Sequence, residues 1–145
     1  MRSDKAMLAI EDRLAIKDLF VRYTTALDAG DVDTVVGCFT EDAVLESPVI
    51  GAIAGREAIR AFAVRFAALR ESGTQFRHMI SNLAAEIENR RARATCYLLV
   101  LITRDGKSRQ LPPGRYECEL VKDGGQWRFR RRVVFHDHAY TLDGI

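Results

Sequence analysis

Hydrophobic residues in the first part of the chain recur at the spacing of an α-helix. Over residues 5–28 the larger apolar side chains follow one another at intervals of three, one, three and four positions: Ile16, Leu19, Phe20, Tyr23 and Leu27. This spacing places them on one stripe of a helical surface. The pattern therefore predicts a long amphipathic helix over 5–28.

Two shorter helices are predicted after it. Gly30 is a typical residue for ending a helix, and Asp31 can cap a new one that runs to about Phe39. In residues 56–71 the apolar positions again step by three and four: Ile59, Phe62, Phe66 and Leu69. We therefore expect a third helix over 56–71.

The segment between the second and third helices is more irregular. "EDAVLES" (41–47) predicts a short strand because of its alternating pattern. Pro48, Gly51 and Gly55 then mark a stretch without regular structure before the third helix.

Four long strands are predicted after Gly73. They are rich in β-branched and aromatic residues, are separated by turn signals at "ENRR", "RDGK" and "KDGGQ", and cover residues 75–88, 91–104, 114–122 and 126–137. Helices followed by long antiparallel strands indicate an α+β fold, with helices packed on one face of a curved sheet. The space between them is a common place for a small ligand. No repeat or linker divides the chain, so we expect one domain over 1–145.

The strand around "FRHMISNL" decides the orientation of a histidine. Strand side chains alternate between the two faces, so four residues share one face: Phe76, His78, Ile80 and Asn82. Because Phe76 and Ile80 are apolar, we expect this face to point toward the core. Leu83, Ala85 and Ile87 then fall on the opposite face. Either this strand is covered on both sides or a β-bulge intervenes, and the sequence leaves both open.

The "KDGGQ" turn sets an expected register for the last two strands. A three-residue loop over Asp123–Gly125 would pair Lys122 with Gln126, and Tyr116 would then face Arg132. A slip of one residue would break this pairing.

Composition narrows the function classes. The 145 residues carry a net charge of +2, too small to favour a nucleic-acid partner, and the basic run "RFRRRV" is typical of a solvated face. Three scattered cysteines without a C-x-x-C pair argue against a thiolate zinc site and fit a reduced compartment. No apolar run suits a signal peptide or a membrane span, so we expect a cytoplasmic protein without membrane contact.

His78 and Asp28 are the candidate proton-transfer residues. An imidazole is well suited to accept a proton near neutral pH, and it needs a partner that stabilises the cation. Asp28 lies at the end of the first predicted helix, where negative charge opposes the helix dipole, which suggests another role for it. The alternatives are a core histidine and an aspartate in an exposed loop.

Four further residues are candidates for binding a substrate: Tyr23, Tyr116, Arg132 and Asn82. Tyr23 belongs to the apolar stripe, so its ring is expected to be buried, although it lies about 140° around the helix from Asp28. The two converge only if the chain turns inward after Leu27. Arg132 could bind an oxygen-rich group, or it could belong to an exposed basic strand face.

No cofactor motif is present. His136 and His138 in "FHDHAY" would share a strand face and could bind a metal, but a third ligand is not evident. Glycine-rich phosphate loops and nucleophile-elbow motifs are missing. We therefore expect neither a metal nor a cofactor.

Several segments together resemble the SnoaL-like branch of the NTF2-like superfamily: "AIKDLFVRYTTALDAGDVDTVVGCFTEDAV", "GREAIRAF", "RHMISNL" and "GRYECELVKDGGQWRFRRRV". The resemblance implies a cone-shaped α+β fold, in which about three N-terminal helices and a strongly curved, mostly antiparallel sheet enclose a pocket. It also implies that His78 is a catalytic base held by Asp28. Tyr23, Tyr116 and Arg132 would match pocket positions.

Two functions follow from this resemblance. One is a cofactor-free lyase of dehydratase type, or an isomerase, acting on a small hydrophobic or polycyclic substrate. The other is a non-catalytic ligand-binding or assembly subunit, like the small subunits of ring-hydroxylating dioxygenases. Apolar residues on both faces of 83–87 and 97–102 suggest a homo-oligomer, either a dimer or a trimer.

Overall fold

The computed structural model describes residues 2–143, and its three helices confirm the predicted ones. They are α1 (Arg2–Ala29), α2 (Val32–Gly37) and α3 (Arg56–Glu71). The Asp31 carboxylate caps α2 by accepting the backbone N–H of Thr34 at 3.2 Å. The second helix ends two residues earlier than expected, because β1 begins at Phe39.

Seven strands form one curved sheet, in the order β2-β1-β7-β6-β4-β3, with β5 also paired to β4. The bounds are β1 (Phe39–Ser47), β2 (Gly51–Ala54), β3 (Gln75–Glu88), β4 (Arg91–Arg104), β5 (Lys107–Gln110), β6 (Gly114–Asp123) and β7 (Gln126–His136). All pairs are antiparallel except the one between β1 and β7. The sequence missed β2 and β5, because each has only four residues and almost no buried side chain.

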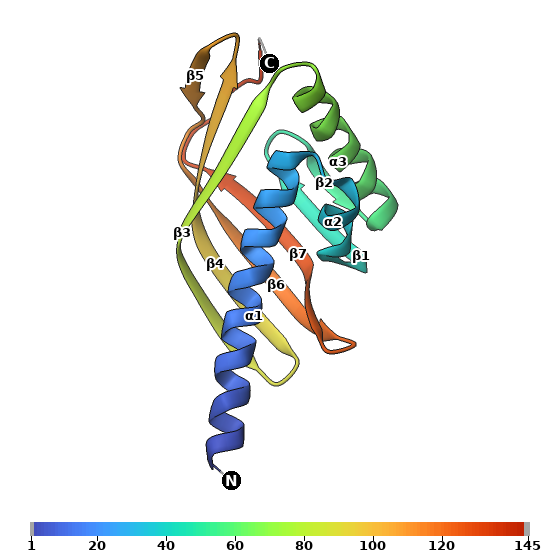
Figure 1. Ribbon diagram of the computed structural model, residues 1–145, viewed down its shortest axis with the longest axis vertical. Helices are drawn as coiled ribbons and strands as arrows, with labels where there is room; N and C mark the ends of the chain where they lie inside the picture. Colours follow the sequence, from blue (N-terminus) through green and yellow to red (C-terminus); the bar gives the residue numbers. More distant parts are fainter. Residues whose placement is uncertain (1, 144–145) are drawn as a thin grey trace.

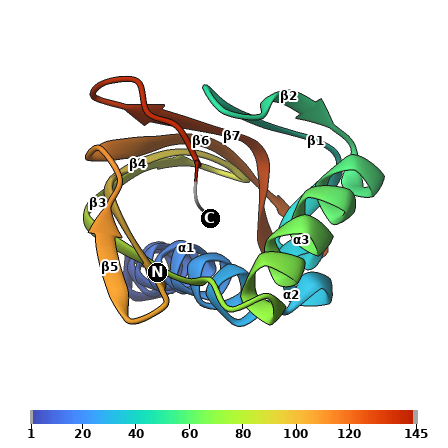
Figure 2. The same ribbon diagram turned by 90° about the horizontal axis from the view of Figure 1, so that it is seen from above.

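The helices cover the concave face of the sheet (Figure 1). In the view from above, the sheet curls around an opening that α1 and α3 close on the other side (Figure 2). The apolar stripe of α1 is buried against this concave face, with Ile16, Phe20 and Tyr23 at most 2% exposed. Burial of the stripe is the main force that holds α1 on the sheet.

A β-bulge in β3 resolves the open question about its faces. Ser81 pairs with Tyr97 but Ala84 pairs with Thr95, so β3 carries one extra residue between them. Asn82 lies there with φ of +57°, a left-handed conformation that asparagine tolerates well. The bulge turns the half-buried Leu83 toward the core side, so the strand is not covered on both faces.

The predicted register of β6 and β7 is wrong. Asp123 pairs with Gln126, so the loop is the two-residue Gly124–Gly125, and both glycines have positive φ. A bulge at Arg130 then shifts the register again, so that Arg132 pairs with Cys118. These shifts leave Tyr116 and Arg132 on the same face as diagonal neighbours.

A polar clamp fastens α1 to the β6–β7 hairpin. The Asp12 carboxylate accepts hydrogen bonds from Trp127 Nε1 and Lys122 Nζ, both at 3.0 Å. Burial by itself raises the pKa of Asp12, but the bonds from Trp127 and Lys122 lower it by more, so the net pKa lies below its ordinary value. The clamp is therefore strongest with Asp12 ionised.

The basic run 128–133 does not form one surface. Arg128 donates to the Gly37 carbonyl, Arg131 forms an ion pair with Glu46 at 3.6 Å, and Arg132 is fully buried. None of the helices within residues 2–143 has both the length and the hydrophobicity that crossing a membrane requires.

Asp12→Ala tests the clamp. It leaves the buried Trp127 N–H without an acceptor, so we expect it to lower the free energy of unfolding by about 1–3 kcal/mol at pH 7. Because the folded-state pKa is depressed, this contribution is present above the unfolded pKa of about 4 and is lost as the pH falls below it. Urea unfolding between pH 3 and pH 7 measures both effects. Asp18→Ala, on the exposed side of α1, is the matched control; equal losses in both variants would contradict the clamp.

Candidate functional site

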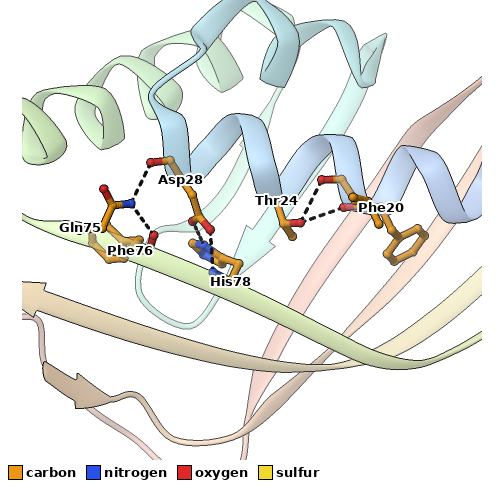
Figure 3. Close-up of polar contacts among 7 residues, drawn as sticks. Phe20, Thr24, Asp28, Gln75, Phe76 and His78 are labelled. Atoms are coloured by element: carbon orange, nitrogen blue, oxygen red, sulfur yellow. Dashed lines mark hydrogen bonds and ion pairs between the residues drawn. The ribbon is translucent and has the colours of Figure 1, made fainter.

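Asp28 and His78 form a compact pair between α1 and β3 (Figure 3). Asp28 Oδ1 lies 2.5 Å from His78 Nδ1, and Asp28 Oδ2 accepts the backbone N–H of His78 at 2.8 Å. One residue thus binds both oxygens of the carboxylate. The side chains are only 12% and 7% exposed, so the pair is shielded from water.

The backbone at the end of α1 holds Asp28 beside β3. Gly30, with φ of +74°, ends the helix, and the next N–H, that of Asp31, bonds back to the Ala26 carbonyl at 2.9 Å. The Gln75 side-chain amide links α1 to β3, because it donates hydrogen bonds to the backbone carbonyls of Asp28 (3.2 Å) and Phe76 (2.8 Å) (Figure 3).

The pair fixes the tautomer of His78. An ionised carboxylate only accepts hydrogen bonds, so Nδ1 carries the proton and Nε2 keeps a free lone pair. The ring of Phe76 stacks near the imidazole at 6.2 Å, and that of Phe66 lies at 5.9 Å. The imidazole of His78 is therefore held in a fixed orientation in apolar surroundings.

His78 lines a cavity inside the cone, with a volume of about 100 Å³. Most of its wall is apolar, including Leu27, Leu45, Phe62, Phe66, Phe76 and Leu98. A few polar side chains interrupt this wall: Tyr23, Ser47, His78, Tyr116, His136 and Tyr140. An apolar cavity with few polar groups is typical of a site for a small organic ligand.

Arg132 lies behind this wall in a cage of aromatic rings. Its guanidinium carbon is 3.6 Å from the ring centre of Tyr116 and 4.2 Å from that of Tyr23, with two phenylalanines next: Phe129 at 4.3 Å and Phe20 at 5.0 Å. Nη1 contacts Cys118 Sγ at 3.3 Å. Arg132 is 0% exposed, and Nε and Nη2 have no hydrogen-bond partner among residues 2–143.

This cage holds a positive charge without a carboxylate beside it. Burial works to lower the pKa of Arg132, but Cys118 and Tyr116 raise it by more, so the guanidinium stays charged. For the two tyrosines, burial has the opposite effect. It raises the pKa of Tyr116 to about 12 and raises the pKa of Tyr23 by more, although the charge of Arg132 works to lower both values. Both phenols are therefore neutral donors with a cation behind them.

The structure brings together some of the predicted site residues and separates others. Asp28 and His78 meet, and Tyr23 and Tyr116 line the same cavity as His78. No inward turn after Leu27 is needed, because α1 continues to Ala29 and β3 passes beside its last turn. Arg132 is placed wrongly by both sequence interpretations, since it is neither on an exposed face nor in the cavity wall.

The prediction for Asn82 is wrong. The bulge that it occupies interrupts the alternation, so its side chain is exposed and lies outside the cavity wall. The strict period of two assumed for residues 76–82 could not reveal this.

The sequence carries no motif that identifies the individual wall residues of segment 47–55 and of the C-terminal tail, although both segments were expected to shape the cavity. Val49 and Ile50, in the β1–β2 turn, and the chain after β7 contribute to the wall. His136 and His138 do not share a face, because β7 ends at His136 and His138 is exposed. Within the described residues, no three histidine, cysteine or acidic side chains form a group suited to a metal ion.

Comparison with known proteins agrees with this architecture. A family model described as a SnoaL-like domain matches residues 8–133. The uncharacterized protein Rv2910c of Mycobacterium tuberculosis is 27% identical in an alignment of 142 positions that covers 90% of this chain and 90% of its own. An NTF2-like protein with a cystatin-like fold from Novosphingobium aromaticivorans has a TM-score of 0.82 at 24% identity, over 98% of this chain and 89% of its own.

Two further solved structures are similar over most of their length. One is a protein from Catenulispora acidiphila in complex with S-DNPA (29% identity, TM-score 0.77, 88% of this chain and 95% of its own). The other is ActVI-ORFA from Streptomyces coelicolor (25% identity, TM-score 0.77, 88% and 98%). The predicted NTF2-like α+β fold is thereby confirmed.

Arg132→Met tests the energetic cost of the caged charge. A buried cation without a counter-ion is destabilising, and an apolar side chain of similar length removes that penalty. We expect Arg132→Met to raise the free energy of unfolding by about 1 kcal/mol or more. Arg132→Lys should lower it, because an ammonium loses more hydration and stacks less well on rings. Urea unfolding measures both; a Met variant clearly less stable than the native protein would show that the cage stabilises the cation fully.

Proposed function

The chain belongs to the SnoaL-like domain family, and on this premise we propose that it is a cofactor-free enzyme that removes a proton from a small hydrophobic substrate. The observation that carries the proposal is the shielded Asp28–His78 pair, whose histidine lines an apolar cavity. The reaction is dehydration, a related elimination, or isomerisation.

His78 is the base in this proposal. Its Nε2 takes a proton from a carbon next to a carbonyl group, and the electron pair of the C–H bond moves onto the carbonyl oxygen as an enolate. The Asp28 carboxylate stabilises the imidazolium that forms, as its bond to Nδ1 allows. The apolar neighbours Phe66 and Phe76 exclude water from this proton transfer.

Tyr23 and Tyr116 are the candidate stabilisers of the enolate oxygen. Their rings line the cavity, and the positive charge of Arg132 lies behind both. That charge strengthens the phenols as hydrogen-bond donors without touching the substrate. In this proposal Arg132 is thus a positioning residue rather than a catalytic one.

The proton can close the cycle in two ways. In a dehydration it passes from His78 to the departing hydroxyl group, which leaves as water while the enolate electrons form the new C=C bond. In an isomerisation it returns to a different carbon of the same molecule. Both routes regenerate the neutral His78 and balance without a cofactor.

The cavity limits the size of the substrate. A volume of about 100 Å³ is below the roughly 150 Å³ of an apolar cavity that binds benzene. A single ring is therefore the upper limit for the cavity as it stands, and a polycyclic substrate requires the cavity to widen. The similar structure from Catenulispora acidiphila is a complex with S-DNPA, which supports ligand binding by this fold.

The non-catalytic alternative is less well supported. An assembly subunit would use the Asp28–His78 pair only to tie α1 to β3, and it would not need that pair to lie beside an apolar cavity. Self-association into a dimer or trimer remains a prediction in either case.

Solvent exchange tests the proton abstraction directly. Small cyclic ketones and β-hydroxy ketones are incubated with the protein in D₂O, and deuterium incorporation next to the carbonyl is followed by NMR, with water loss followed in parallel. His78→Ala and Asp28→Asn should each slow exchange by about a hundredfold or more, because general-base catalysis contributes that much. Circular dichroism checks that both variants are folded.

The matched controls are His138→Ala and Asp18→Asn, an exposed histidine and an exposed helix aspartate outside the cavity. Both should retain the native exchange rate. Full activity in folded His78→Ala would refute the mechanism.

A further inference from the structure

A second histidine, His136, lies in the wall of the cavity at the end of β7, away from the Asp28–His78 pair in the sequence and in its contacts. β7 ends at His136, and the chain then returns across the opening of the cone (Figure 2). The Asp137 N–H bonds to the Pro113 carbonyl at 2.8 Å and fixes the start of this return. His136 and Tyr140 both contribute to the cavity wall.

The tautomer of His136 is also fixed, by a different partner. Its Nδ1 lies 2.9 Å from the Pro112 carbonyl oxygen. A carbonyl only accepts, so Nδ1 carries the proton and Nε2 keeps its lone pair. The local backbone depends on Gly114, where an added Cβ would overlap the Phe135 carbonyl and lie 3.2 Å from His136 Nδ1.

The Nε2 lone pair of His136 accepts at most a weak hydrogen bond within the described residues. The Tyr140 hydroxyl lies 3.4 Å from Nε2, which is long for a hydrogen bond of this type, and the two rings meet edge to face at 4.7 Å. Both side chains are half-buried. The pair thus offers one acceptor and one hydroxyl with spare hydrogen-bonding capacity.

We propose that His136 and Tyr140 form a second polar site that binds a hydroxyl group of the ligand. The ligand hydroxyl donates to His136 Nε2 and accepts from the Tyr140 hydroxyl. The ligand class is an uncharged molecule of about one ring that carries a hydroxyl at the mouth end, such as a phenol or a cyclic alcohol. This deepens the proposed function and rests on it only in that the substrate occupies the same cavity.

Other polar groups fit this site less well. A carbonyl oxygen accepts from Tyr140 but leaves the Nε2 lone pair unpaired, and a carboxylate would place negative charge against that lone pair. Burial raises the pKa of Tyr140, so its hydroxyl stays a neutral donor. A hydroxyl satisfies both partners at once with a single atom.

The two histidines suit different tasks. His78 has a carboxylate on Nδ1, which stabilises the protonated ring, whereas His136 has only a neutral carbonyl there. A base gains from the first arrangement, whereas the second is sufficient for a hydrogen-bond acceptor. His136 therefore orients the ligand while His78 exchanges its proton.

Phenol and toluene are the probes, since they have nearly the same size and differ in one hydroxyl. Binding to the full chain is measured by NMR titration, and ¹⁵N-labelled histidine reports which Nε2 the phenol contacts. We expect the native protein to prefer phenol and the His136 Nε2 signal to shift. His136→Phe keeps a ring against Tyr140 and removes the acceptor, so it should lower the ratio of phenol affinity to toluene affinity by about tenfold.

Tyr140→Phe should reduce the preference for phenol in the same direction, and His138→Phe, two residues away and exposed, is the matched control. The proposal is overturned if the native protein binds neither probe or shows no preference. It is also overturned if His136→Phe keeps the preference, or if phenol shifts only the His78 signal. If deuterium exchange fails with every ketone while the His136-dependent preference persists, the proposed reaction fails and this binding site stands.

Discussion

The bond between the last turn of α1 and strand β3 is the constraint on which the site depends. Asp28 lies in the last turn of α1, where a negative charge opposes the helix dipole and destabilises the helix by about 0.3–1 kcal/mol. A hydrogen bond to a charged group contributes about 1.5–3 kcal/mol, and His78 supplies two of them from one residue. The bonds outweigh the unfavourable position. They hold α1 against β3, help to close the cone, and determine which nitrogen of His78 is free.

Two bulges decide which side chains reach the interior. The extra residue in β3 keeps Phe76 and His78 inside while also turning Leu83 inward farther along the strand. The extra residue at Arg130 reverses the alternation of β7, so that Arg132 enters the core although Arg128 points outward. Helical periodicity was sufficient to predict the three helices and the apolar stripe of α1. Strand alternation predicted His78 inward but failed at Asn82 and Arg132, because a bulge adds one residue without changing the polar pattern of the sequence.

The pairing of Asp28 with His78 could be anticipated, because a carboxylate at a helix end is an anomaly that local structure does not explain. Which residues of segment 47–55 and of the C-terminal tail line the cavity could not be predicted. Val49 and His136 lie far apart in the sequence, and both line the cavity because β1 pairs in parallel with β7 and so carries the β1–β2 turn toward the end of β7. That pairing crosses more than 80 positions of sequence and leaves no local signal. The same holds for the Arg132 cage, whose rings come from α1, β6 and β7.

The buried charge of Arg132 and the apolar cavity are best understood together. A protein selected for stability alone would place an apolar side chain between Tyr23 and Tyr116, since nothing among residues 2–143 neutralises the guanidinium. A charge behind two phenols is useful only if negative charge develops in front of them, and the apolar wall makes that interaction stronger because little water screens it. In the proposed mechanism, His78 is the base that would create such a negative charge. The proposal therefore links the two residues, because Arg132 would serve the reaction only if His78 removes a proton, and a ligand without an acidic C–H bond would use neither.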